Sequence, residues 1–191
     1  TPDATALIDA DSDQTWTYRA FDRRVDAVTE QLENVVYGPD DRLGVLMETR
    51  VAFAEVYFAA MRRGVTVVPL NVRETAAELE SKARRTALDA VVCESETEPL
   101  ALEVADCPVV SVDSPTHDGV ESLQPVGEAD ATPVPLDRDA THLIMFTSGT
   151  SGEPKAVRLT VGNLVASATA SAFRLGIQPD DRWLCCLPMY H

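Results

Sequence analysis

Small hydroxylated residues, two glycines and a lysine are concentrated in one stretch, Thr147-Ser148-Gly149-Thr150-Ser151-Gly152-Glu153-Pro154-Lys155. Glycine lets main-chain N–H groups approach an anion closely, and hydroxyl groups add hydrogen-bond donors in little space. Lys155 supplies a compact positive charge, and it is one of only two lysines in the 191 residues. These residue types in this order predict a loop that binds the phosphate groups of a nucleotide.

The spacing within this stretch differs from that of a Walker A loop, which needs Gly, four residues, Gly, Lys and then Ser or Thr. Here Gly149 and Gly152 lie three positions apart, and Lys155 follows a proline. The ordinary P-loop NTPase pattern is therefore absent. The alternative for this stretch is a surface turn rich in Ser, Thr and Gly, which commonly joins a strand to a helix.

The elements that would position the loop are an apolar run before it and a helical pattern after it. Residues 143–146 are Leu-Ile-Met-Phe and indicate a buried strand, which we expect over 142–146. The residues from Leu159 onward are typical of the start of a helix, expected over about 161–174. A further apolar strand is expected over 183–187.

Strand and helix patterns alternate along the rest of the chain as well. Apolar runs predict strands at 43–47, 65–70, 90–93 and 109–112, and helical spacing of apolar residues predicts helices at 21–32, 53–60 and 74–88. Gly64 is expected to close the second helix. Residues 113–141 are rich in Pro, Asp, Glu and Thr, and we expect them to form an exposed connection.

This alternation predicts an α/β fold: a doubly wound, mainly parallel sheet flanked by helices. Ligands of such sheets bind at the carboxyl ends of the strands. The loop at 147–155 follows the carboxyl end of its own strand, as that rule requires.

The chain is strongly acidic, with 31 Asp and Glu against 16 Lys and Arg and a formal net charge of −15. This charge argues against a general nucleic-acid binder, which would carry a basic face. High acid content with few lysines resembles proteins of a salt-rich cytoplasm, where net charge aids solubility and salt screens its self-repulsion. The alternative is an ordinary acidic protein from a GC-rich genome.

The cysteines and histidines do not form a metal-binding or disulfide pattern. The cysteines are Cys93, Cys107, Cys185 and Cys186, without a C-x-x-C pair, and the histidines His117, His142 and His191 are dispersed. We expect all the cysteines to be buried and reduced, as is usual in a cytoplasmic protein. No signal peptide and no run of about 18 apolar residues is present, so neither secretion nor a membrane span is indicated.

The stretch Thr147–Lys155 resembles the phosphate loop of the adenylate-forming superfamily, which contains acyl-CoA synthetases, luciferases and the adenylation domains of peptide synthetases. The family pattern is roughly Thr-Ser-Gly-Thr-Thr-Gly-x-Pro-Lys-Gly. Ser151 replaces the second residue of the Thr-Thr pair and keeps its hydroxyl, while Ala156 stands where Gly is usual. Other segments resemble further motifs of the superfamily: 15–21, 38–45, 64–71 and 187–191.

Within the superfamily, the chain looks most like the o-succinylbenzoate–CoA ligases of menaquinone biosynthesis. Residues 155–163 lack the Thr-His pair that is common in fatty acyl and aryl ligases. Residues 181–188 look most similar in sequence to the succinylbenzoate enzymes. Another acyl-CoA or aryl-CoA synthetase is the alternative.

The resemblance implies a ligase that uses ATP, Mg²⁺ and coenzyme A. A carboxylate attacks the α-phosphate of ATP to give an acyl-adenylate and pyrophosphate, and the thiolate of coenzyme A then displaces AMP. The resemblance assigns the β and γ phosphates to backbone amides of Gly149 and Gly152, to Lys155, and to the hydroxyls of Thr147, Ser148, Thr150 and Ser151.

The resemblance also implies a substrate pocket formed by Met189, Tyr190 and His191, because Leu187–His191 is similar to a Leu-Pro-Leu-Phe-His motif that lines the acyl pocket. Lys155 and His191 are the expected catalytic residues, with His191 bordering the carboxylate. Core packing is the alternative for Met189 and Tyr190, and a purely structural role is the alternative for His191. No metal ligand is expected within these residues.

The adenine and Mg²⁺ motif of the superfamily, its ribose-binding Asp, its hinge and its mobile lobe with a catalytic Lys have no counterpart before residue 191. We therefore expect residues 1–191 to be the N-terminal portion of an adenylation domain without the C-terminal lobe, as an excised piece or a truncated gene product, and expect this portion alone to be inactive. A non-catalytic nucleotide-binding module is the alternative if the chain is naturally this short. A carboxylic acid, ATP and coenzyme A are the expected partners, with no nucleic acid and no membrane.

Overall fold

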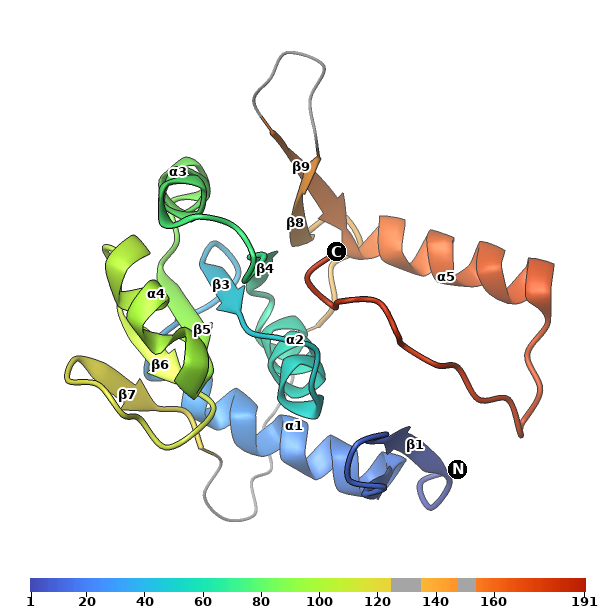
Figure 1. Ribbon diagram of the computed structural model, residues 1–191. Coiled ribbons are helices and arrows are strands. Elements are labelled where there is room, and N and C mark those ends of the chain that lie inside the picture. Colours follow the sequence, from blue (N-terminus) through green and yellow to red (C-terminus); the bar gives the residue numbers. More distant parts are fainter. Residues whose placement is uncertain (125–134, 148–153) are drawn as a thin grey trace.

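A mixed sheet forms the centre of the chain in the computed structural model, which describes residues 1–124, 135–147 and 154–191 (Figure 1). Within these residues the sheet has seven strands, in the order β7-β6-β5-β3-β4-β8-β9. Every neighbouring pair is parallel except β8 and β9, which are antiparallel. The predicted fold class, a mainly parallel α/β sheet flanked by helices, is confirmed.

The strands of this sheet are short, and the central ones are almost completely buried. Their bounds are β3 Arg42–Leu46, β4 Thr66–Pro69, β5 Ala90–Cys93, β6 Val109–Ser111, β7 Val120–Ser122, β8 Thr141–Thr147 and β9 Lys155–Thr160. Strands covered by helices on both faces need apolar side chains at every position, which explains their continuous Val-rich runs. The strands predicted at 43–47, 65–70, 90–93, 109–112 and 142–146 are confirmed to within a residue or two at their ends.

In the described part of the chain, five α-helices flank or extend from the sheet: α1 Tyr18–Leu32, α2 Val51–Arg63, α3 Ala76–Thr86, α4 Glu98–Val104 and α5 Val161–Leu175. A two-stranded ribbon, β1 Thr5–Ile8 with β2 Thr15–Thr17, precedes α1, and one 3₁₀ turn, Ser95–Thr97, precedes α4. The predicted helices at 21–32, 53–60, 74–88 and 161–174 are confirmed. Gly64 adopts the left-handed conformation, with φ of 73°, and closes α2 as predicted.

The sheet separates two hydrophobic cores, because successive side chains of a strand point to opposite faces. Val67 and Val92 belong to the core under α1 and α2, whereas Val68 and Val91 belong to the core under α3 and α4. Figure 1 shows these two pairs of helices on either side of the strands. The two-sided burial explains why the central strands could be predicted from hydrophobicity alone.

The segment after the phosphate loop differs from the prediction, because it forms strand β9 before α5 begins. Residues from Leu159 were expected to start a helix, but β9 pairs with β8 over Lys155–Thr160 and α5 starts only at Val161. The alternation of Val157 and Leu159 with Ala156 and Arg158 was a strand signal in the sequence. The loop therefore joins two antiparallel strands instead of a strand and a helix.

The strand predicted at 183–187 is wrong: these residues have no regular secondary structure and pair with no strand among the described residues. Trp183 is 85% exposed and Leu184 73% exposed. Cys185 and Cys186 are exposed for the same reason, which contradicts the expected burial of all cysteines, although Cys93 is buried and all four are free thiols. An apolar run becomes a strand only where a neighbouring strand supplies hydrogen-bond partners.

The predicted exposed connection at 113–141 is also partly wrong. Residues 120–122 form β7 on β6, and Leu123 is 2% exposed in the hydrophobic core. Three-residue strands carry too little periodicity to be recognised in a polar stretch. Among the described helices, none has the length and apolar character needed to cross a membrane.

Candidate nucleotide and acyl site

The β8–β9 hairpin carries the two ends of the predicted phosphate loop. Thr147, the last residue of β8, lies directly opposite Lys155, the first residue of β9. Both residues are exposed. The hydroxyl and the ammonium group that frame the loop therefore start from adjacent positions of one antiparallel ladder, with Cα atoms about 5 Å apart in such a pair.

The remaining residues of the predicted loop, Ser148, Gly149, Thr150, Ser151 and Gly152, lie outside the described residues. Their predicted contacts with phosphate stay predictions. The described flanks agree with a binding loop in one respect: the loop leaves the sheet at the carboxyl end of a parallel strand, where ligands of such sheets bind.

The Leu187–His191 segment lies against the carboxyl end of β3. The main-chain N–H of Met189 donates a hydrogen bond to Thr49 Oγ1 at 2.9 Å. Thr49 belongs to the short turn between β3 and α2. The segment predicted to line the acyl pocket is thus fixed to the same sheet that carries the phosphate loop.

The three predicted pocket residues differ in exposure. Tyr190 is 3% exposed within the core under α1 and α2, and Met189 packs against that core. His191 is exposed, with its ring 5.1 Å from the ring of Tyr190. Tyr190 and Met189 thus take part in core packing, the alternative given for them, whereas His191 is exposed. The role of these three residues in a substrate pocket stays a prediction.

The register of the sheet brings both segments to one edge. Leu43 of β3, Val67 of β4 and Leu143 of β8 lie in one row across three parallel strands. Thr147 follows four residues after Leu143, and Thr49 follows six after Leu43. Because neighbouring strands are about 4.8 Å apart and β4 lies between β3 and β8, the ends of these two strands are separated sideways by roughly 10 Å.

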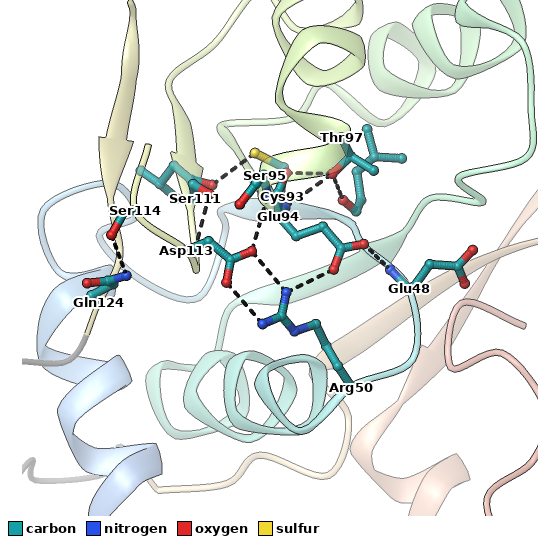
Figure 2. A network of polar contacts seen from close by, with 12 residues as sticks. Glu48, Arg50, Cys93, Glu94, Ser95, Thr97, Ser111, Asp113, Ser114 and Gln124 are labelled. Carbon is teal, nitrogen blue, oxygen red and sulfur yellow. Dashed lines mark hydrogen bonds and ion pairs between the residues drawn. The ribbon is translucent and has the colours of Figure 1, made fainter. Parts of the chain in front are cut away.

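A polar network beside this edge was not anticipated from the sequence, and Figure 2 shows it. Arg50 donates to Glu94 Oε2 at 3.0 Å, and two of its nitrogens donate to the carboxylate of Asp113 at 2.9 and 3.0 Å. The N–H of Glu48 donates to the other oxygen of Glu94 at 2.7 Å. The turn at 48–50, which holds Thr49, is thereby tied to the ends of β5 and β6.

The network also fixes the ionisation of Asp113. Burial alone would raise the pKa of Asp113, but hydrogen bonds from Arg50 and from the Ser95 main chain outweigh burial and lower that pKa below its usual value. Within the described residues, Glu94, Glu96 and Asp113 are a group of carboxylates close enough to share a cation. Arg50 already donates hydrogen bonds to Glu94 and Asp113, so its guanidinium group compensates the negative charge of these two carboxylates.

A short sequence signal could have pointed to this network. Glu94 and Asp113 each follow an apolar strand by one or two residues, and Arg50 precedes the helix after another strand. Charged residues just beyond parallel strands gather at one edge of a sheet. Which of them pair cannot be read from spacing, because it depends on the strand order β6-β5-β3.

Solved structures and curated proteins resemble the chain over its whole length. The 2-succinylbenzoate–CoA ligase of Bacillus pumilus (strain SAFR-032) is 32% identical over 194 residues, which cover 100% of this chain and 37% of the ligase. The o-succinylbenzoate CoA synthetase of Bacillus subtilis, solved with the acyl-adenylate intermediate OSB-AMP, superposes with a TM-score of 0.87 at 30% identity and likewise covers 100% of this chain and 37% of its own.

A second structure of the Bacillus subtilis synthetase contains ATP and a magnesium ion. It superposes with a TM-score of 0.86 at 29% identity and covers 100% of this chain and 49% of its own. The chain thus spans well under half the length of the curated ligase that it matches. The family described as AMP-binding enzyme matches residues 1–191. Together with the parallel sheet and the hairpin at its carboxyl edge, this match over the entire sequence means that the chain belongs to the AMP-binding enzyme family.

Proposed function

We propose that these residues are the N-terminal portion of an AMP-forming acid–CoA ligase, and that the acid is 2-succinylbenzoate. The observation that carries the proposal is the agreement between sequence and geometry at one sheet edge. The phosphate-loop motif and the Leu-Pro-Met-Tyr-His motif, 32 residues apart between Lys155 and Leu187, both lie at carboxyl ends of parallel strands. The similarity to ligases solved with an acyl-adenylate and with ATP and magnesium supports the same reaction.

The first half-reaction joins the acid to AMP. A carboxylate oxygen forms a bond to the α-phosphorus of ATP, and the bond from that phosphorus to the bridging oxygen of the β-phosphate breaks, which releases pyrophosphate. Bound Mg²⁺ would neutralise part of the phosphate charge. The described residues near the hairpin contain no group of carboxylates that could hold this ion, so its protein ligands are expected elsewhere.

Lys155 fits the role of electrostatic stabiliser in this step. Lys155 is the first residue of β9, is exposed, and is paired with Thr147 in the antiparallel ladder. A compact cation beside the leaving pyrophosphate stabilises the charge that develops on the bridging oxygen. Lys155 and the loop hydroxyls would therefore act on the β and γ phosphates.

His191 fits the role of a residue that borders the carboxylate of the acid. The ring of His191 is exposed, whereas its neighbour Tyr190 is buried in the core. The main-chain N–H of His191 donates a hydrogen bond to the carbonyl oxygen of Pro188 at 3.1 Å. A rigid anchor next to an exposed imidazole restricts where the ring can lie. In the second half-reaction the thiolate sulfur of coenzyme A attacks the acyl carbon of the acyl-adenylate, and AMP leaves.

The reaction class is tested with the protein as its gene encodes it. Labelled pyrophosphate should exchange into ATP only when an acid is present, and the nucleotide product should be AMP. Formation of ADP and phosphate would overturn the proposal. Binding of ATP without any exchange, whichever acid is supplied, would favour the non-catalytic nucleotide-binding module.

The acid is tested separately with a panel of 2-succinylbenzoate, benzoate, a medium-chain fatty acid and acetate, compared by kcat/KM. A site that pairs the second carboxylate of succinylbenzoate should reject acids without it by a factor of about 10⁴, because its polar groups would be left unpaired. Equal rates with benzoate or the fatty acid would remove the substrate assignment and leave the adenylation chemistry intact, as expected of another acyl-CoA synthetase.

A further inference from the structure

One side chain of α3 contacts β8 and the residue that precedes β9, at the two ends of the phosphate loop. Arg85 Nη1 donates a hydrogen bond to the carbonyl oxygen of Pro154 at 2.7 Å. The guanidinium carbon of Arg85 also lies 5.8 Å from the ring centroid of Phe146, within the range of a cation–π contact. Phe146 immediately precedes Thr147, and Pro154 immediately precedes Lys155.

A second cation of α3 lies on the same aromatic ring. Lys82, one turn before Arg85, has its Nζ 4.9 Å from the centroid of Phe146 and forms an ion pair with Glu74. Lys82 is only 8% exposed, which is unusual for a lysine. Both lysines of the sequence therefore lie near the phosphate loop: Lys155 at the start of β9, and Lys82 against the ring of Phe146 near the end of β8.

The helix that carries both cations is well anchored. Thr75 and Glu78 form a reciprocal capping box at its start, Leu79 is completely buried, and Ala87 closes it in the left-handed conformation with φ of 47°. Capping and burial each restrict movement of the helix relative to the sheet. Arg85 thus projects from a fixed element.

Among the described residues, the outer strand of the hairpin is less firmly held than α3. Within that part of the chain β9 is the last strand of the sheet and pairs with β8, and its first four residues are exposed. Edge segments with few buried contacts open more easily than the rest of a fold. A misplacement of about 1 Å at a catalytic group can cost on the order of 10²-fold in rate. A contact at Pro154 is therefore well placed to control the position of Lys155.

We propose that Arg85 is a positioning residue for adenylation: it fixes the Phe146 and Pro154 ends of the hairpin and so holds Lys155 in place for the β and γ phosphates. This inference rests on the proposed function, because it assigns Arg85 to the step that releases pyrophosphate. Lys82 supports it by fixing the ring of Phe146. Arg85 acts through the hairpin and need not touch the nucleotide.

The test uses Arg85→Met, which keeps most of the length of the side chain and removes its charge and its donors. Arg84→Met is the matched control, since Arg84 is the adjacent residue of the same helix, has a side chain that is 66% exposed and pairs with Glu80 on the surface. In the protein as its gene encodes it, Arg85→Met should lower kcat/KM for ATP in pyrophosphate release by about tenfold, the effect of one lost hydrogen bond to a charged group. Arg84→Met should lower it by less than about twofold.

Two further measurements separate positioning from a general structural role. Thioester formation from a supplied acyl-adenylate should stay within about twofold of the unsubstituted protein, since it does not use the β and γ phosphates. Arg85→Lys, which can still donate to the Pro154 carbonyl, should restore most of the loss. Equal losses in both half-reactions, or equal behaviour of Arg85→Met and Arg84→Met, would overturn the inference.

Amide hydrogen exchange reports on the hairpin without any activity. The amides of Lys155–Thr160 should exchange faster in Arg85→Met than in Arg84→Met, because the tie between α3 and Pro154 is lost. Unchanged exchange would overturn the positioning role even if catalysis fell. If the unsubstituted protein shows no acid-dependent pyrophosphate release, the proposed function fails, and this exchange measurement still decides whether Arg85 holds the hairpin.

Discussion

The N–H of Met189 donates to the hydroxyl of Thr49 across 140 positions of the sequence, at 2.9 Å. This bond fixes the Leu187–His191 segment at the carboxyl end of β3. The turn that contains Thr49 is itself held by hydrogen bonds from Glu48 and Arg50 to the carboxylate of Glu94. The exposed ring of His191 therefore extends from a fixed main chain. Its position depends on a residue that no motif includes.

Thr49→Val should raise KM for the acid, because valine keeps the shape of threonine and removes the acceptor of the Met189 N–H. One neutral hydrogen bond corresponds to about 1 kcal/mol, so kcat/KM for the acid should fall by roughly fivefold. Steady-state kinetics with the acid varied at saturating ATP measure the effect. Thr49→Ser, which keeps the hydroxyl, should behave like the unsubstituted protein. An unchanged KM in Thr49→Val would mean that the bond does not position the pocket.

Lys155→Ala should slow pyrophosphate release by on the order of 10²-fold, the scale for one electrostatic stabiliser of a transition state. Thioester formation from a supplied acyl-adenylate should change much less. Arg158→Ala is the matched control, because Arg158 is an exposed cation of the same strand whose guanidinium contacts Thr141. Loss of both half-reactions in Lys155→Ala would point to a damaged fold, and equal losses in the two variants would point to general charge.

Arg50→Met should lower the free energy of unfolding by about 2 kcal/mol, because Glu94 and Asp113 would lose the charged donor of their hydrogen bonds. The side chain of Glu94 is only 8% exposed, so water compensates it poorly. Urea unfolding monitored by circular dichroism measures the change. Adding Glu94→Gln to Arg50→Met should recover part of the loss, since it removes the uncompensated buried charge. Arg84→Met, which breaks a surface pair, should cost less than about 0.5 kcal/mol.

His142 should make the fold sensitive to mild acid. Burial lowers the pKa of His142 to about 4, and the ring packs against Tyr57 at 4.7 Å between centroids. The unfolded chain has a histidine pKa of about 6.5, so it takes up the proton more readily than the folded protein. The stabilisation is therefore complete above pH 6.5 and falls as the pH drops from 6.5 towards 4, by on the order of 3 kcal/mol.

Urea unfolding at a series of pH values tests this window. His142→Gln should remove most of the slope between pH 6.5 and 4, whatever its effect at neutral pH. A second loss of stability, which Glu98 causes at lower pH, should remain in His142→Gln and serves as an internal control. Burial alone would raise the pKa of Glu98, but hydrogen bonds from His117 and Thr116 lower it to about 2, so its contribution is lost only below about pH 4.5. A slope that survives in His142→Gln would assign the acid sensitivity to other groups.

Salt should stabilise the protein if its acidity reflects a salt-rich cytoplasm. With a net charge of −15, self-repulsion opposes the compact state at low ionic strength. The screening length falls from about 10 Å at 0.1 M salt to about 3 Å at 1 M. The melting temperature should rise by at least about 3 °C between 0.1 and 2 M KCl, the effect of roughly 1 kcal/mol on a chain of this length. Sucrose at matched osmolality controls for solute exclusion, and a flat response to KCl would favour an ordinary acidic protein.

The sequence by itself determined the class of the fold and predicted a phosphate loop at 147–155. Strands such as Ala90–Cys93 are apolar at every position because helices cover both faces, and such runs are visible without coordinates. Glycines, hydroxyls and Lys155 in a fixed order predicted a phosphate loop because an anion needs close main-chain donors and a cation. These are local requirements, so they leave a local trace in the sequence.

Only the tertiary structure decided which distant residues meet. The pairing of Lys155–Thr160 with β8 replaced the expected helix start, and residues 183–187 pair with no strand among the described residues although they are largely apolar. Arg50 meets Asp113, Thr49 meets Met189 and Arg85 meets Pro154 because the order of the strands brings their ends together. A single hydrogen bond between residues far apart in the chain imposes no spacing or periodicity on the sequence, and for that reason these contacts appear only in the folded protein.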